Sequence, residues 1–225
     1  IPYGSANSPN ADAVRYYPNN DTDNVSTYGY LYSWAAATHG ANGSSANPSG
    51  LQGICPEGWH LPSTAEWNHL TNYLEANEVY RCGSGYYVGK ALCADYAWQT
   101  SGNSCAVGND LSLNNTSGFS MLPAGHCVYA EGSQFGTEAS FWTSNSSSPD
   151  NRNIAYNEHS LSSYGFSRRY ALSVRCVLGE GLNPAAVTTS VVGNIMSNSA
   201  TCGGDITSDG GSTVTERGIC WSLSP

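Results

Sequence analysis

Cysteine is the residue type in this chain with the widest range of chemistry, because its thiolate can attack substrates, bind metal or form a disulfide. The chain has eight cysteines, and no two of them form the Cys-x-x-Cys pair that is typical of thiolate metal sites. An even number of dispersed cysteines is typical of proteins that fold in an oxidising compartment. We therefore expect four disulfides, an extracellular location and no cysteine-bound metal.

The five histidines are not spaced as metal ligands, because none belongs to a His-x-His or His-x-x-x-His pair. Hydrogen-bonded or surface roles are expected for them. Residues 21–24 (Asp-Thr-Asp-Asn) are a weak oxygen cluster that allows a Ca²⁺ site, and a plain turn is the alternative. The tripeptides Glu-Pro-Asn and Trp-Asn-Asp, with which calcium-dependent lectins bind sugars, are absent. We therefore expect no metal site and no cofactor.

The stretch 144–170 has the composition of a binding surface. Its 27 residues include eight Ser, four Asn and three Tyr, and its charges are mainly basic. Tyr provides large contact area at low entropic cost, and Ser and Asn adapt their hydrogen bonds, so antibody paratopes favour the same mixture. The alternative is a solvated loop. If the stretch binds a ligand, the contacts are expected from Asn145, Asp150, Arg152, Asn153, Tyr156, Asn157, His159, Tyr164, Arg168, Arg169 and Tyr170.

Helical signals come first in the chain and strand signals follow, which predicts an α+β domain. The clearest helix spans 63–76, where Ser63 and Glu66 form a capping box and Trp67 begins an apolar stripe. Shorter helices are expected over 29–38 and 88–95. From residue 119 onward, short apolar runs separated by Gly, Pro, Ser and Asn predict antiparallel strands at 119–122, 127–129, 140–144, 153–157 and 171–177.

After residue 180 the sequence changes character. Runs at 186–192, 199–203 and 218–221 alternate like sandwich strands, with a turn predicted at 209–211. A complete immunoglobulin-like sandwich needs about seven strands. We therefore expect two domains, one over 1–180 and a partial all-β immunoglobulin-like domain over 181–225.

The overall charge argues against two classes of partner. With a net charge of −9, the chain lacks the broad basic surface that binding to nucleic acids or anionic membranes requires. No apolar run is long enough to span a bilayer. The chain begins without a signal peptide, which indicates part of a longer surface protein.

Five sequence blocks stand in order along the chain: Tyr28–Trp34, Cys55–Trp67, Gly118–Gly125, Phe141–Ser144 and Leu172–Val177. Together they resemble the Fibrobacter succinogenes major paralogous domain family. That family in turn resembles the C-type-lectin-like and formylglycine-generating-enzyme-like fold, through the Leu-Pro-Ser-x-x-Glu-Trp helix start and the terminal strand. The resemblance implies a secreted or cell-surface protein of Bacteroidota or Fibrobacterota, without an assigned activity.

The resemblance also suggests disulfide pairs. Members of the family commonly carry cysteines at the positions of Cys55 and Cys176, which implies a bridge between them, and those at Cys82 and Cys105 tend to occur together. Cys93 and Cys127 replace residues that are usually Ala and an aromatic, so an extra bridge between them is expected. The remaining pair, Cys202 and Cys220, would lie within the second domain.

These observations lead to three functional hypotheses. The leading one is an extracellular recognition or adhesion domain that binds a glycan or protein on a host or neighbouring cell through 145–170. That stretch also resembles the variable regions diversified by retroelements, although such regions usually end a protein. The second hypothesis is a stalk or pilus-assembly module without a ligand. The third is a formylglycine-generating-like oxidase, which we do not expect because Cys176 has no nearby cysteine partner.

Overall fold

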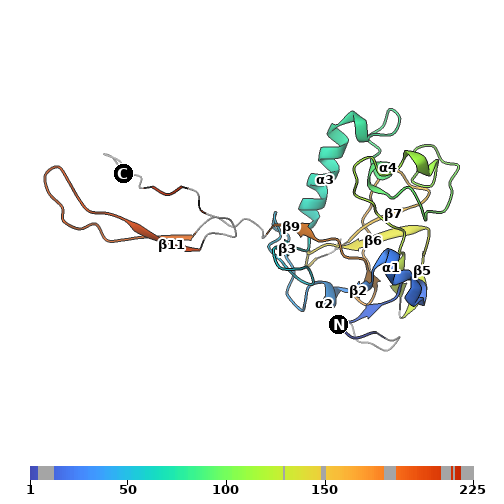
Figure 1. Cartoon of the computed structure of the whole chain (residues 1–225), viewed down its shortest axis with the longest axis horizontal. Helices are drawn as coiled ribbons and strands as arrows, with labels where there is room; N and C mark the ends of the chain where they lie inside the picture. The colour runs from blue at the N-terminus through green and yellow to red at the C-terminus, as the bar shows by residue number, and fades with distance from the viewer. Residues whose placement is uncertain are drawn as a thin grey trace.

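The computed structural model describes residues 1–4, 13–128, 130–147, 151–179, 186–208, 214 and 216–218. Short helices and antiparallel sheets alternate along this part of the chain, which confirms the mixed α+β class (Figure 1). None of the described helices is both long and apolar enough to cross a lipid bilayer.

The longest helix is α3, Thr64–Ala76, and it forms where its capping signal predicts. The Ser63 hydroxyl accepts a hydrogen bond from the backbone N–H of Glu66 at 3.3 Å. In return, the Glu66 carboxylate accepts one from the backbone N–H of Ser63 at 2.9 Å. These bonds satisfy donors that a helix N-terminus otherwise leaves unpaired. Trp67 and Leu74 are the residues that α3 buries in the core.

The other helices are single turns. They are α1 (Val25–Tyr28), α2 (Trp34–Ala37), α4 (Gly89–Leu92) and the 3-10 turns η1 (Pro18–Asn20), η2 (Thr22–Asn24), η3 (Glu78–Tyr80) and η4 (Leu111–Leu113). The expected helix over 29–38 is wrong in its first half. There Leu31–Ser33 forms strand β2, and the helix begins only after Ser33, whose hydroxyl accepts a hydrogen bond from Ala36 N–H.

The main sheet has the strand order β1-β2-β8-β4-β5, and its neighbouring strands are antiparallel. Its strands are β1 (Arg15–Tyr16), β2, β8 (Ala171–Leu172), β4 (His126–Val128) and β5 (Glu131–Ser133). Two further pairs complete the body: β6 (Glu138–Trp142) with β7 (Asn151–Ala155), and β3 (Trp59–His60) with β9 (Val177–Leu178).

Three of the expected strands differ from the structure. The strand expected over 199–203 forms only the bridge between Gly193 and Thr201, and the strand β11 follows it at Gly204–Ser208. The strand expected over 119–122 is reduced to one bridge, between Met121 and Cys93, because Ser120 adopts a left-handed φ of 58° that interrupts extended backbone. The strand expected over 171–177 is split. Its first part, β8, joins the main sheet, and its last part, β9, pairs with β3. Between them, Ser173 bonds to the backbone of β6.

Two disulfides are present among the described residues, Cys55–Cys176 and Cys82–Cys105. The expected bridge between Cys93 and Cys127 is wrong, and so is the expectation that all eight cysteines are oxidised. Both residues are buried free thiols. They cannot meet because they pack in different parts of the core: Cys93 lies with Trp98 and Met121, and Cys127 lies with Val14 and Tyr16. The expected Cys202–Cys220 pair lies partly outside the described residues.

Beyond the body, β10 (Ala186–Thr189) and β11 (Gly204–Ser208) form an antiparallel hairpin. Among the described residues, no hydrogen bond or strand pairing joins this hairpin to residues 1–179. Its apolar side chains are open to solvent, with Val191 95% exposed and Ile195 74% exposed. The turn at 209–211 and residues 219–221 of the last expected strand lie outside the described residues.

Candidate functional site

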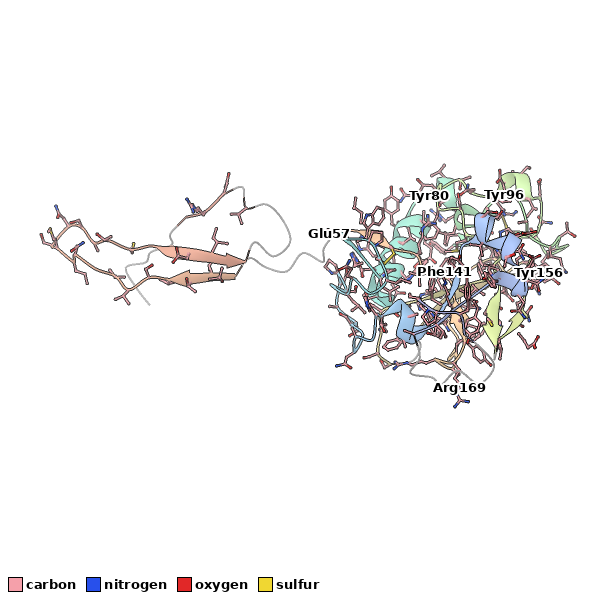
Figure 2. The ribbon with its side chains drawn as sticks, turned by 60° about the horizontal axis from the view of Figure 1, so that its bottom comes forward. Glu57, Tyr80, Tyr96, Phe141, Tyr156 and Arg169 are labelled. Atoms are coloured by element: carbon pink, nitrogen blue, oxygen red, sulfur yellow. A yellow bond between two sulfur atoms is a disulfide. The ribbon has the colours of Figure 1, made fainter. Side chains whose placement is uncertain are left out.

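The stretch 144–170 does not present its side chains on one surface. Asn145 accepts a hydrogen bond from the backbone N–H of Thr64 at 2.8 Å, and so supports the start of α3. Asn157 is exposed, whereas Tyr156 packs against the main core cluster. Figure 2 shows Tyr156 and Arg169 at well-separated places on the body. Asp150 lies outside the described residues.

Two of the expected contact residues are buried, so the expectation that they face a ligand is wrong. Arg152 is 7% exposed and Asn153 is 2% exposed. The cause is strand β7, which pairs with β6 along one edge and with Ser162 along the other. The Arg152 guanidinium donates to the Asn68 side chain at 2.7 Å and to the Ser163 hydroxyl at 2.6 Å. Burial lowers the pKa of Arg152 from its usual value.

The remaining expected residues divide into two groups. His159 packs against Tyr87 with tilted rings, whose centroids lie 3.8 Å apart. At the other end of the stretch, the Arg168 guanidinium lies 3.7 Å from the centre of the Trp34 ring. Tyr170 stacks on His126, and only Tyr164 and Arg169 are exposed in this group. Most of these side chains therefore already have aromatic partners within the protein.

A mainly apolar, open groove runs along α3 in the described part of the chain, with a volume of about 540 Å³. This size lies within the range of about 300–1,000 Å³ that is usual for small-molecule sites. One wall is a face of α3, formed by Glu66, Trp67, His69, Leu70 and Tyr73. The opposite wall is formed by Phe119, Arg175 and Val177. We call this pocket the α3 groove.

Local folding explains how these walls meet. Residues 66, 69, 70 and 73 follow the spacing that puts helical side chains on one face. In the second wall, Arg175 lies in the segment between β8 and β9, which the Cys55–Cys176 disulfide and the β3–β9 pair hold near the start of α3. Figure 1 shows β3 and β9 beside that end of α3.

The two charged side chains of the groove differ in how they are paired. Glu66 is fully engaged: Oε1 lies 2.5 Å from His60 Nε2, and Oε2 accepts from the backbone N–H groups of Ser49 and Ser63. Arg175 donates from Nη2 to the Phe119 carbonyl at 2.8 Å, and its guanidinium lies 4.4 Å from the Phe119 ring centre. Among the described residues, no carboxylate pairs with Arg175.

Arg175 also lines a second, smaller pocket of about 350 Å³, which we call the tyrosine hollow. Its other walls include Tyr28, Tyr30, Tyr32, Ser120 and Ser173. Burial raises the pKa of Tyr28 and of Tyr32, so their hydroxyls remain neutral. The hollow therefore combines aromatic rings with hydroxyl groups, whereas the α3 groove is mainly apolar.

Other chemistry finds little support in the described part of the chain. No group of three or more His, Cys, Asp or Glu side chains there is arranged to hold a metal ion. Asp21 caps the turn η2 by accepting from the backbone N–H of Asp23 at 3.0 Å. Burial raises the pKa of the Cys127 thiol to about 11 and that of Cys93 well above its ordinary value. Such thiols are poor nucleophiles.

Sequence reasoning did not identify the α3 groove, although two signals for it exist. The i, i+4, i+7 spacing of Glu66, Leu70 and Tyr73 marks a helix face beside the buried stripe. The final block contains Arg175 next to Cys176, a cation placed beside a predicted bridge. What could not be deduced is that β8 and β9 separate, which turns this arginine toward α3.

Comparison with known proteins gives one match. The family model of the Fibrobacter succinogenes major domain matches residues 4–178, which include both pockets and both disulfides. No curated protein and no solved structure matches the chain.

Proposed function

Because the chain belongs to the Fibrobacter succinogenes major domain family, which suggests a surface-associated domain of uncertain function, we propose that it recognises an extracellular ligand. It would serve as a binding or adhesion domain of a bacterial surface protein. The α3 groove, rather than residues 145–170 as a whole, makes the contacts.

The observation that carries this proposal is the composition of the α3 groove. A mainly apolar pocket with a few polar groups is the usual form of a ligand site. Tyr73 stands at the rim and is 56% exposed. Aromatic and arginine side chains contribute most strongly to binding interfaces, and the groove offers Tyr73, Phe119 and Arg175.

We also propose the finer fold assignment, a C-type-lectin-like domain over 1–180 and a partial immunoglobulin-like domain over 181–225. The first is supported by the capped start of α3 and by the place of β8 between β2 and β4. The second is supported by the antiparallel β10–β11 hairpin.

A stalk or assembly module without its own ligand is the second candidate, and the hairpin favours it. Exposed apolar side chains, such as Val191 and Ile195 in the connection between β10 and β11, are typical of surfaces that other chain segments cover. An oxidase is not proposed, because Cys176 is held in a disulfide and the Cys127 thiol is buried.

Two tyrosines of nearly equal exposure allow a matched test of the binding site. Tyr73 lines the α3 groove and is 56% exposed, whereas Tyr164 lies in the stretch 144–170 and is 53% exposed. Wild type, Tyr73→Ala and Tyr164→Ala are compared on a glycan array and in a host-surface pulldown. We expect Tyr73→Ala to weaken binding about tenfold or more and Tyr164→Ala to have little effect.

Thermal melts check that both variants stay folded, since exposed substitutions usually cost within about 0.5 kcal/mol. Loss of binding in Tyr164→Ala but not in Tyr73→Ala would indicate that the binding site lies in residues 144–170 instead of the α3 groove. A wild-type protein that binds no glycan and captures no host component would favour the stalk or assembly role.

A further inference from the structure

We propose that the ligand is an oligosaccharide that carries a carboxylate sugar, and that Arg175 binds the carboxylate. This inference rests on the proposed function, since it names the class of ligand for the same site. It follows from the charge of Arg175 and from the different chemistry of the two pockets beside it.

Arg175 is the unpaired cation of the α3 groove. One of its guanidinium nitrogens donates to the Phe119 carbonyl, and no other hydrogen-bond partner of Arg175 is found in the part of the chain that the structure describes. The guanidinium carbon also lies 4.4 Å from the centre of the Phe119 ring. An arginine that is tethered to a backbone carbonyl and still has donors to spare suits the two oxygens of a carboxylate, because the guanidinium can donate two parallel hydrogen bonds.

The acidic side chain of the groove, Glu66, is occupied by other partners and leaves Arg175 available for a carboxylate ligand. The Glu66 carboxylate already contacts His60 and accepts hydrogen bonds from the backbone N–H groups of Ser49 and Ser63. Among the described residues, it forms no ion pair with Arg175. A ligand that enters the groove therefore meets a guanidinium that is not in an ion pair, within a mainly apolar surface.

The form of the two pockets indicates a sugar chain rather than a simple organic acid. Arg175 lines both pockets, so a ligand anchored there reaches the tyrosine hollow as well as the α3 groove. Sugar rings have apolar faces and hydroxyl edges. Tyr28, Tyr30 and Tyr32 offer rings and neutral hydroxyls, and Ser120 and Ser173 add two more hydroxyls.

The net charge of the chain limits the ligand to a few negative charges. At −9, the protein as a whole repels a polyanion such as a nucleic acid, whose binding depends on a broad basic surface. A single carboxylate in contact with Arg175 is attracted at short range, where solvent and salt screen the pair less.

The experiment compares acidic oligosaccharides with neutral partners of the same size. Wild-type protein is tested on an array of acidic and neutral oligosaccharides, and the acidic hits are measured by calorimetry beside their methyl esters. The variants are Arg175→Gln, Arg175→Lys and, as a control, Arg169→Gln, which changes an exposed arginine away from both pockets. Methyl esters remove the ligand charge without changing the protein, so this comparison does not depend on how well a variant folds.

We expect the methyl esters to bind wild type about tenfold or more weakly than the acids. Arg175→Gln should lower affinity for the acids by a similar factor and erase the difference between acid and ester. Arg175→Lys should keep part of that difference, and Arg169→Gln should change nothing.

Three results would overturn the inference. In the first, neutral and acidic oligosaccharides bind equally well and Tyr73→Ala weakens the binding of both. This result contradicts the carboxylate inference but supports the proposed function. Acidic binding could survive Arg175→Gln in a folded protein. A captured protein ligand, with no glycan bound, would also contradict it, whereas a groove that binds nothing at all would remove the proposed function itself.

Discussion

Cys127 is a buried thiol whose ionisation is coupled to folding. It lies in β4 and is 1% exposed, and burial raises its pKa from 9.0 to about 11. Below pH 9 the thiol is protonated in both the folded and unfolded states. Between pH 9 and 11 the unfolded chain releases this proton and the folded chain keeps it. The free energy of unfolding should therefore fall as the pH rises through this window.

For Cys127 alone, the fall should reach about 1.4 kcal/mol at pH 10, one unit above the unfolded value. Urea titrations of wild type and Cys127→Ala at pH 8, 9 and 10 measure it. The difference in unfolding free energy between the two proteins isolates this thiol from every other titrating group. A difference that is constant across the three pH values would contradict the assignment.

Arg152 illustrates what composition cannot reveal about a single residue. Its neighbours are mostly Ser, Asn and Tyr, which predict an exposed surface, yet the side chain is enclosed. The partners that enclose it, Asn68 and Ser163, lie 84 and 11 residues away in sequence. Neutral hydrogen-bond partners leave no charge pattern in a sequence. A buried arginine without a carboxylate is therefore predictable only once the strand pairing is known.

Among the elements, α3 depends on its N-terminal cap, and this dependence can be measured. Ser63→Ala removes the hydroxyl that pairs with Glu66 N–H, and we expect a loss of about 1 kcal/mol in unfolding free energy. Thr71→Ala is the matched control, because it removes a hydroxyl from the interior of the same helix. There the hydroxyl bonds only to preceding carbonyls, so its loss should cost little. Urea denaturation compares the two.

An equal loss in both variants would mean that the hydroxyl at residue 63 acts through packing rather than as a cap. Glu66→Ala extends the comparison. It should cost more than Ser63→Ala, because the carboxylate also bonds to Ser49 and His60.

Elements defined by local signals were predictable, and elements defined by distant pairing were not. The capping box and apolar stripe of α3 lie within 14 residues and need no knowledge of the rest of the chain. The boundary between β8 and β9 depends on residues far away in the sequence, because Leu172 pairs with Tyr32 and Val177 pairs with His60. The α3 groove depends on this boundary, which is why its second wall was not anticipated.

At the scale of the whole molecule, the two disulfides should differ in their effect on stability. Cys55 and Cys176 are 121 residues apart in sequence, and Cys82 and Cys105 are 23 apart. In the chain-entropy model, the longer loop is worth roughly 5 kcal/mol and the shorter roughly 3.5 kcal/mol. Paired Cys→Ala variants of each bridge are compared by urea denaturation. The Cys55–Cys176 variant should be the less stable of the two, and the reverse order would contradict the model.

The Cys55–Cys176 bridge has a further consequence when the chain is under tension. A pulling force applied to the backbone before residue 55 and after residue 176 passes through the sulfur–sulfur bond, so the 121-residue loop carries no load. Only the short β3–β9 pair can be peeled away beyond Cys176, while roughly 400 Å of contour length stays locked inside the loop. Tyr73, Phe119 and Arg175 all lie within that loop. A chain stretched in this way keeps Tyr73, Phe119 and Arg175 together, whereas Asn47 and Val177, which line the groove from outside the loop, can be pulled away from it.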